Sequence, residues 1–302
     1  GVLDALLERA GASSCVSWSI DGDRVLVLRL AELDPGDAIA PRARWIAAGA
    51  ALERVLVEAR RSGLWLRERL RLDSEDDGLV ATLERVDEPR ARSGSPWPLV
   101  GSRGLNDDLV DALERTARAA GGHLRVILRG ARHEAMARAL AEAERLALLT
   151  PGLSARARDD YEGSGGGARL ATALLRDPEA RALVRAIDGG RTLVCASLRA
   201  LSESDGVALL SVPDATRASL VAGGRARARL RMFLETCSIR ARPMGAALHV
   251  LTVDPARELT PRERATVQEL RERLDALLDG GFTDGVPVAL LRLADDDRGA
   301  PR

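Results

Sequence analysis

The sequence predicts an α+β fold in which one unit occurs twice. Residues 49–64, "GAALERVLVEARRSGL", and residues 224–239, "GRARARLRMFLETCSI", carry the same helical pattern. Each segment follows a β-rich run that starts near an Asp-Gly turn, "DGDRVLVL" in one half and "DGVALLSV" in the other. Each half also ends in an apolar run typical of a strand, "LVATLERV" and "VPVALLRL". The shared order of strand, helix and strand indicates a duplicated α+β unit.

The spacing of apolar residues and the positions of turn residues predict the elements of the first half. The leucines of "LDALLERAG" recur at helical spacing and stop at Gly11, and residues 25–30 form a β-rich run after the turn "DGD". Residues 42–62 have apolar side chains on one face, so we expect a long helix that closes at Gly63. Residues 64–72 and 79–86 alternate, which predicts two strands joined by the turn "DSEDDG".

A middle region separates the halves. Residues 87–105 are rich in Pro, Gly and Ser and read as a linker, and Asn106 then caps a helix that runs to about residue 120. A strand, "HLRVIL", follows at 123–128. Helices are expected at 131–149, 153–161, 168–175, 178–188 and 192–200, and "EGSGGGAR" is expected to be a flexible loop.

The second half repeats the pattern of the first. We expect a strand at 205–212, a helix at 216–238 and a final strand at 286–293. The helix before that strand has Thr260 as its N-cap and Pro261 at its first position, and it closes at Gly280. The expected organisation is a first unit at 1–90, a linker with middle helices at 91–205 and a second unit at 206–302, packed as one pseudo-dimeric domain.

The long helices align position by position. The matched pairs are Gly49 with Gly224, Ala51 with Ala226, Arg54 with Arg229, Val55 with Leu230, Val57 with Met232 and Leu64 with Ile239. Amphipathic helices share apolar spacing by default, so the order of elements carries more weight than this alignment.

Composition excludes several classes of function. The 45 basic residues balance the 45 acidic ones, which does not favour binding to nucleic acid or to a membrane surface. Lysine is absent, so Schiff-base and phosphate-loop lysine chemistry is excluded. Three dispersed cysteines suit a reducing cytoplasm, where we place the protein. The chain begins without methionine inside a helical pattern, as expected for a piece of a longer protein.

These segments, in this order, resemble the nitroreductase-like flavoprotein superfamily. The closest likeness is to the single-chain branch in which two nitroreductase units are fused, the Acg-type proteins. The segments that carry the resemblance are "WSIDGDRVLVL" with "AAGAALERVLVEARRSGL", "AEAERLALLTPGLSARARDDY", "GVALLSVPDATRASLVAGGRARARLRMFLETCSIRARPMGAALHVL" and "RERLDALLDGGFTDGVPVALLRL".

The resemblance implies a fold and an activity. Ordinary members are homodimers that hold flavin mononucleotide (FMN) between their subunits. A fused chain would build that interface internally, as a monomer, with its two central helices packed together through Gly49, Ala50, Gly223 and Gly224. The implied activity passes hydride from NAD(P)H through the flavin to a small acceptor such as a nitroaromatic or a quinone.

The resemblance also implies cofactor contacts. The segment "GASSCVSWSI" stands where relatives bind phosphate, so Ser13 and Ser14 match the serine there. Arg103 is what remains of an arginine-rich segment, and Arg292 falls near a phosphate-binding cation of relatives. The turn "RPMGA" matches backbone groups that face the flavin ring, through Pro243, Met244 and Gly245. No catalytic side chain and no metal are expected, since the flavin carries the chemistry.

Two other readings remain open. The asparagine, glutamine and proline of the relatives' phosphate segment are missing here. This departure favours a degenerate, non-catalytic member, either a flavin-storing protein or an interaction module of a larger biosynthetic protein. A third reading is an unrelated α+β scaffold. His123 and His133 are expected to be structural, and Cys195 and Cys237 are expected to be core residues, whereas Cys15 lies near the predicted pocket.

Overall fold

The computed structural model confirms the α+β class. It describes residues 2–11, 15–22, 24–32, 41–73, 78–86, 104–150, 177–186, 190–252, 259–280 and 285–295. Within those ranges, none of the helices is both long enough and apolar enough to span a membrane.

Two compact units make up the chain, and each draws on segments far apart in sequence. The first comprises Gly1–Val100, Ala112–His123 and Val212–Phe233, and the second comprises Gly101–Asp111, Leu124–Ser211 and Leu234–Arg302. These units are defined by which residues contact one another. The ranges 1–90, 91–205 and 206–302 expected from the sequence follow the order of the segments along the chain instead. The difference arises because residues 212–233, which lie in the range expected for the second unit, pack within the first compact unit.

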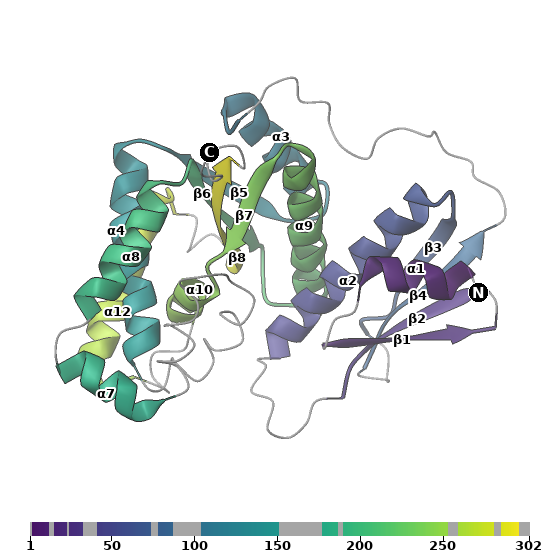
Figure 1. The fold of residues 1–302 in the computed structure, drawn as a ribbon. Coiled ribbons are helices and arrows are strands. Elements are labelled where there is room, and N and C mark those ends of the chain that lie inside the picture. The colour runs from purple at the N-terminus through teal and green to yellow at the C-terminus, as the bar shows by residue number, and fades with distance from the viewer. Residues whose placement is uncertain are drawn as a thin grey trace. The chain divides into compact units, whose positions relative to one another are not determined.

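The first unit contains one sheet and its helices (Figure 1). Its strands lie in the order β1-β2-β4-β3, with every neighbouring pair antiparallel. Its elements are α1 (Val2–Ala10), β1 (Val16–Asp21), β2 (Val25–Leu30), α2 (Pro41–Arg61), β3 (Trp65–Leu70), β4 (Leu79–Val86) and most of α9 (Arg217–Thr236).

Alternation along the strands gives this sheet one buried face. Leu26 and Leu28 are fully buried, and the register places Leu26 opposite Leu83 and Leu28 opposite Ala81, both also fully buried. Helix α2 contacts β1, β2 and β3. The opposite face is more polar, with Arg67 exposed on it. The period-2 pattern read from the sequence therefore sets which face α2 covers.

The second unit contains a sheet and a helical cluster. The strands lie in the order β5-β6-β8-β7, and β7 pairs antiparallel with β8. Its elements are β5 (His123–Leu128), α4 (Ala131–Leu149), α7 (Pro178–Ala186), α8 (Gly190–Ser202), β6 (Gly206–Val212), β7 (Ile239–Pro243), α10 (Gly245–Thr252), α12 (Pro261–Leu277) and β8 (Val286–Asp295). Helix α3 (Asp107–Arg118) begins in this unit and ends in the first.

The core of the second unit is built largely from alanine and leucine on α4. Met136 and Leu140 are fully buried there, and α4 contacts α8, α10 and α12. With few aromatic residues in the chain, small side chains on α4 allow several helices to approach it closely. This cluster also buries one end of the β6–β8 surface, through Val207, Leu209 and Leu290.

In the first unit, α2 and α9 touch backbone to backbone. A Cβ atom added to Gly49 would lie 2.0 Å from the carbonyl oxygen of Val221, and one added to Gly224 would lie 2.0 Å from that of Ile46. The contact is reciprocal, since each glycine faces the residue that precedes the other glycine by three positions. Only glycine permits this approach.

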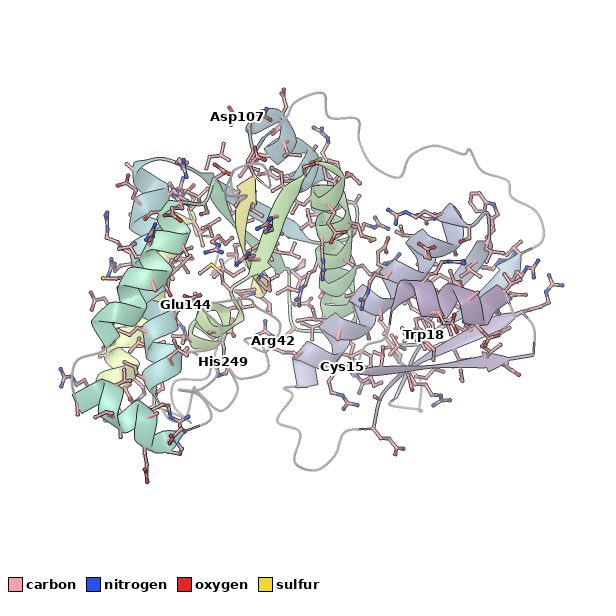
Figure 2. The ribbon with its side chains drawn as sticks, viewed as in Figure 1. Cys15, Trp18, Arg42, Asp107, Glu144 and His249 are labelled. Atoms are coloured by element: carbon pink, nitrogen blue, oxygen red, sulfur yellow. The ribbon has the colours of Figure 1, made fainter. Side chains whose placement is uncertain are left out.

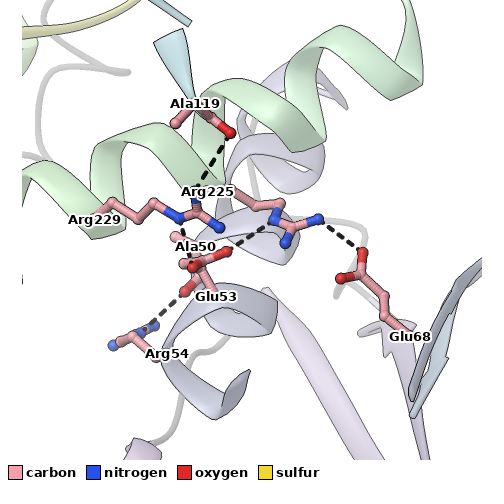
Figure 3. Close-up of polar contacts among 7 residues, drawn as sticks. All are labelled: Ala50, Glu53, Arg54, Glu68, Ala119, Arg225 and Arg229. Carbon is pink, nitrogen blue, oxygen red and sulfur yellow. Dashed lines mark hydrogen bonds and ion pairs between the residues drawn. The ribbon is translucent and has the colours of Figure 1, made fainter. Parts of the chain in front are cut away.

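A buried carboxylate lies beside this contact (Figure 3). Glu53 of α2 is 1% exposed and accepts hydrogen bonds from Arg225 (2.8 Å) and Arg229 (2.6 Å) of α9. Arg225 also pairs with Glu68 of β3 at 2.7 Å, and Arg229 donates to the carbonyl oxygen of Ala119. A carboxylate withdrawn from water must be paired, so α2 and α9 are held in one register by charge as well as by shape.

Many sequence expectations agree with the structure to within a few residues. The strands at 25–30, 79–86 and 123–128 and the helix at 131–149 coincide with β2, β4, β5 and α4. Asn106 caps α3 through Leu109 N–H, and Thr260 forms a capping box with Glu263 at α12. The helices expected at 153–161 and 168–175 and the loop "EGSGGGAR" lie outside the described residues. Strand β7 and helix α10 were not anticipated.

Replacing either contact glycine with alanine is expected to destabilise the fold. The added methyl group of Gly49→Ala or Gly224→Ala would overlap a carbonyl group, so the helices must separate, at a cost of about 2–4 kcal/mol in the free energy of unfolding. Arg227→Ala, at an exposed position on α9, is the control and should change it by about 1 kcal/mol or less. Urea denaturation measures both, and equal stability of the glycine variants and the control would contradict the close approach.

Glu53→Gln is expected to destabilise the protein by about 3–5 kcal/mol, because it leaves Arg229 partly buried without a carboxylate and leaves Arg225 with Glu68 alone. Glu58→Gln on the same helix is the matched control. Glu58 pairs with Arg9 at 2.9 Å, but the side chains are 21% and 49% exposed, so its loss should cost only about 0–1 kcal/mol. Calorimetric or urea unfolding of the two variants would distinguish them, and similar losses would count against a buried ion network.

Candidate functional site

A cavity of about 250 Å³ opens in the second unit, where β7 and β8 meet the C-terminal end of α8. Three arginines and three carboxylates line it. They are Arg240, Arg242, Arg292, Glu203, Asp205 and Asp295. The rest of the described lining is small, from Ala200, Ser204 and Ala294, so charged groups dominate the chemistry of this cavity.

The pairing of β7 with β8 brings the arginines together. Arg242 lies directly opposite Arg292 in the antiparallel register. Arg240 precedes Arg242 by two residues, so it points to the same face of the sheet. The alternate residues, including Ile239 and Leu293, are buried on the other face. Arg292 is half-buried, and Arg240 and Arg242 are exposed at the mouth of the cavity.

The electrostatics of Arg292 reflect this crowding. Burial lowers the pKa of Arg292 from its ordinary value, and the charge of Arg242 lowers it further, whereas Glu144 and Glu203 act in the opposite direction. Two guanidinium groups side by side, one of them partly desolvated, favour the presence of an anion.

Glu144 on α4, labelled in Figure 2, is close enough to Arg292 for their charges to interact. Burial raises the pKa of Glu144 from its ordinary value, while a hydrogen bond with Ser197 of α8 and the charge of Arg292 lower it.

The carboxylates at the rim have structural contacts. Asp205 accepts a hydrogen bond from the backbone N–H of Asp295 at 2.8 Å, and Glu203 pairs with Arg199 one turn earlier on α8 at 2.8 Å. Arg129 donates to the carbonyl oxygens of Ser202, Glu203 and Ser204, which satisfies the C-terminal end of α8. These contacts fix the end of α8 against the sheet.

A serine and a histidine meet next to the cavity. Ser204 Oγ lies 3.1 Å from His133 Nε2, and both residues are 1% exposed. The serine hydroxyl donates its proton to the carbonyl oxygen of Leu201, so the imidazole must donate to Ser204. A histidine that donates to the serine is not its general base. The pair is therefore a structural contact between α4 and α8, as expected for His133.

The structure describes only some of the predicted cofactor residues. Ser13, Ser14 and Arg103 lie outside the described residues, so their predicted role is untested. Arg292 lines the cavity.

The predicted ring-facing turn lies at the end of β7. Pro243 is its exposed last residue, and Gly245 begins α10. Met244 is 6% exposed within the core of the second unit, and its backbone N–H donates to the carbonyl oxygen of Leu290 at 2.9 Å. The N–H of Met244 is thus already engaged in joining β7 to β8.

Sequence reasoning missed Arg240, Arg242 and Glu144. The signal for the first two was the R-x-R spacing in "IRARP", which puts both side chains on one face if the segment is a strand. Glu144 gave no signal, because a glutamate among alanines on an amphipathic helix reads as solvent-exposed.

Other residue types give no site within the described segments. Cys15 is half-buried, Cys195 is exposed and Cys237 is half-buried, so neither of the expected core cysteines is fully buried. No group of three or more His, Cys, Asp or Glu side chains there could hold a metal ion. No protein-family model matches the chain, and a search of curated proteins finds no match.

Acid is expected to destabilise the fold through His133. Burial lowers the pKa of His133 below its ordinary value of 6.5, with Arg129 adding to the effect and Asp205 and Glu134 opposing it. Below about pH 6.5 the unfolded chain takes up a proton that the folded chain resists, so the free energy of unfolding falls as pH falls toward the folded pKa.

His133→Gln keeps a donor for Ser204 without a titrating group, so its free energy of unfolding should depend less on pH between about pH 5 and 7. Urea denaturation at both ends of that range is the measurement. His123→Gln, at an exposed position, is the matched control. An unchanged slope in His133→Gln would show that another group causes the acid sensitivity.

Proposed function

We propose that the chain is an internally duplicated, nitroreductase-like protein that binds FMN and passes hydride from NAD(P)H to a small acceptor. One observation carries the proposal: the two sheets have the same strand order when strands are matched along the chain. β1-β2-β4-β3 in one sheet corresponds to β5-β6-β8-β7 in the other, and α2 and α9 each join the second strand of a repeat to its third.

Residue-level register supports the duplication. If Gly49 is matched to Gly224 and the count continues without a gap, Arg67 of β3 matches Arg242 of β7. Arg67 pairs with Glu84 of β4, and Arg242 pairs with Arg292 of β8. One residue along, Glu68 pairs with Leu83 and Pro243 pairs with Leu291, as antiparallel pairing requires in both the β3–β4 and the β7–β8 pair. Helix and strand therefore correspond through one alignment.

The contact between α2 and α9 supports the pseudo-dimer. Ile46 and Gly49 on α2 face Gly224 and Val221 on α9, and these four residues are exchanged in pairs by the same alignment. In a two-fold dimer interface, each residue contact occurs twice, with the two partners exchanged. The contacts between α2 and α9 have this form. Both sides here lie in one chain, which supports a monomer with an internal dimer-like interface.

The residues present fit the phosphate end of FMN. A phosphate monoester is a dianion, and Arg292, which is half-buried, and Arg242, which is exposed, offer it neighbouring guanidinium groups. The cavity, about 250 Å³, is smaller than the ~300–1,000 Å³ typical of whole-ligand pockets, so it suits part of the cofactor. When bound, the flavin would supply hydride exchange at its N5 atom. Arg292 would hold and orient the cofactor, and Ser13, Ser14, Arg103 and the turn at Pro243–Gly245 remain the other proposed contacts.

A second candidate is a non-catalytic member of the same fold, either a flavin-storing protein or an interaction module. The engagement of Met244 favours it, because the N–H of Met244 already bonds Leu290 and its side chain is buried in the core. Fewer free donors at this turn would leave the flavin ring less firmly held.

Purification and titration of the full chain test both candidates. The oxidoreductase proposal expects flavin absorbance in the purified protein or saturable FMN binding that raises the melting temperature. It also expects NAD(P)H oxidation with a nitroaromatic or quinone acceptor. Flavin binding without NAD(P)H oxidation would favour the storage function, and neither colour nor stabilisation by excess FMN would exclude both flavin functions.

A further inference from the structure

We propose that β1 is a self-association edge, through which two copies of the chain pair strand to strand. The edge lies in the first unit alone, so it does not rest on the flavin function proposed above. The internal contact between α2 and α9 needs no second copy. Strand β1, by contrast, lies at one end of its sheet and pairs only with β2 among the described strands (Figure 1).

Half of the backbone groups of β1 point away from β2. The N–H of Ala31 donates to the carbonyl oxygen of Cys15, so these residues form a hydrogen-bonded pair that continues the register of β1 and β2. Such pairs alternate along an antiparallel ladder, so the N–H and C=O groups of Val16, Trp18 and Ile20 face the open edge. No described residue forms a backbone hydrogen bond with them on that side. These groups are therefore a template for a further strand.

The other three sheet edges in the described part of the chain differ from β1 in charge. Each of their strands carries arginine, namely Arg67 and Arg69 of β3, Arg125 of β5, and Arg240 and Arg242 of β7. Charged side chains on an edge strand oppose pairing with another chain. Residues 16–20 of β1, "VSWSI", contain neither a charge nor a proline. Strand β1 is therefore the edge that the sequence leaves unprotected.

The apolar side chains of β1 are incompletely covered on the face that α2 packs against. Trp18, labelled in Figure 2, and Ile20 are half-buried. Their partners on β2, Leu28 and Leu26, are fully buried. The difference follows from position, because a central strand has a neighbour on each side and β1 has one. A strand added along the open edge would remove this apolar surface from water.

The sequence of β1 selects a second copy of the chain as its partner. "VSWSI" reads almost the same in both directions about Trp18. In an antiparallel pair with its two-fold axis at Trp18, the two Trp18 side chains would face each other. Val16 would face Ile20 of the second copy, and Ser17 would face its Ser19. Apolar groups would meet on one face and hydroxyl groups on the other, and both kinds of cross-strand pair stabilise a sheet.

This register is specific, and the contact is small. A slip by one residue would set the indole ring of Trp18 against a serine and turn the free backbone groups away from each other. The pairing joins two four-stranded sheets into one continuous sheet. One strand pair falls at or below the low end of the ~1,200–2,000 Å² that stable interfaces bury. The expected dimer is therefore weak and depends on protein concentration.

Sedimentation velocity of the full chain over about three decades of protein concentration tests the edge. The variants are Ser17→Lys/Ser19→Lys and Ser17→Glu/Ser19→Glu, which change only exposed side chains. Like charges would face each other in a pair of identical variants, so we expect the dissociation constant of the dimer to rise about tenfold or more. The control is Ala265→Lys/Ala276→Lys, which adds two charges at exposed positions of α12 and should dimerise as the wild type does.

A mixture of the lysine and glutamate variants separates loss of the edge from loss of the fold. Opposite charges then face each other across the two-fold axis, so we expect the mixture to dimerise more strongly than either variant alone, and most strongly at low ionic strength. A wild type that stays monomeric at every concentration would overturn the proposal. So would charged variants that dimerise like the wild type, or a mixture that dimerises no better than its components.

Discussion

The backbone contact between α2 and α9 is the constraint on which the first unit depends. Gly49 and Gly224 let the helices approach until carbonyl groups occupy the space of a side chain. That approach excludes water from the flank of the contact, where Glu53 is 1% exposed. A carboxylate so placed needs partners, and Arg225 and Arg229 supply them from the facing helix. The close approach of the helices thus buries the carboxylate, and its ion pairs with the arginines in turn fix the register of the helices.

The ion network makes the helix pair asymmetric although its glycines are symmetric. By the alignment of the helices, Glu53 corresponds to Ala228, Arg225 to Ala50 and Arg229 to Arg54. If α9 packed in the same way against a copy of itself, Ala228 would take the place of Glu53 and the arginines would lose their carboxylate. The contact therefore favours α2 over a second α9 through these ion pairs. The two helices are therefore not interchangeable at this contact, although their glycines are.

Local signals in the sequence were enough to locate most elements. Apolar alternation gave β2 and β4, and the Thr260 capping box gave the start of α12, because the interactions involved lie within a few residues. Strand β7 was missed because two arginines and a proline occupy three of its five residues. It forms a strand by pairing with β8, which is distant in sequence. The buried role of Glu53 was missed for a similar reason, since desolvation by α9 is invisible in the sequence of α2. Arg292 was predicted only from the family resemblance. Arg240 and Arg242 could be placed beside it only from the register of β7 and β8.

Helices of the second unit cover one face of its sheet, whereas the face of the first sheet that bears Arg67 is exposed. In the first sheet, β1 and β2 form a hairpin, and Arg67 pairs with Glu84 at the surface. In the second, α4, α7 and α8 lie in the chain between β5 and β6, and α8 reaches the face bearing Arg292. A helix end that covers charged side chains must leave them paired or solvated. Glu203, Asp205 and Asp295 supply as many carboxylates to this cavity as it has arginines.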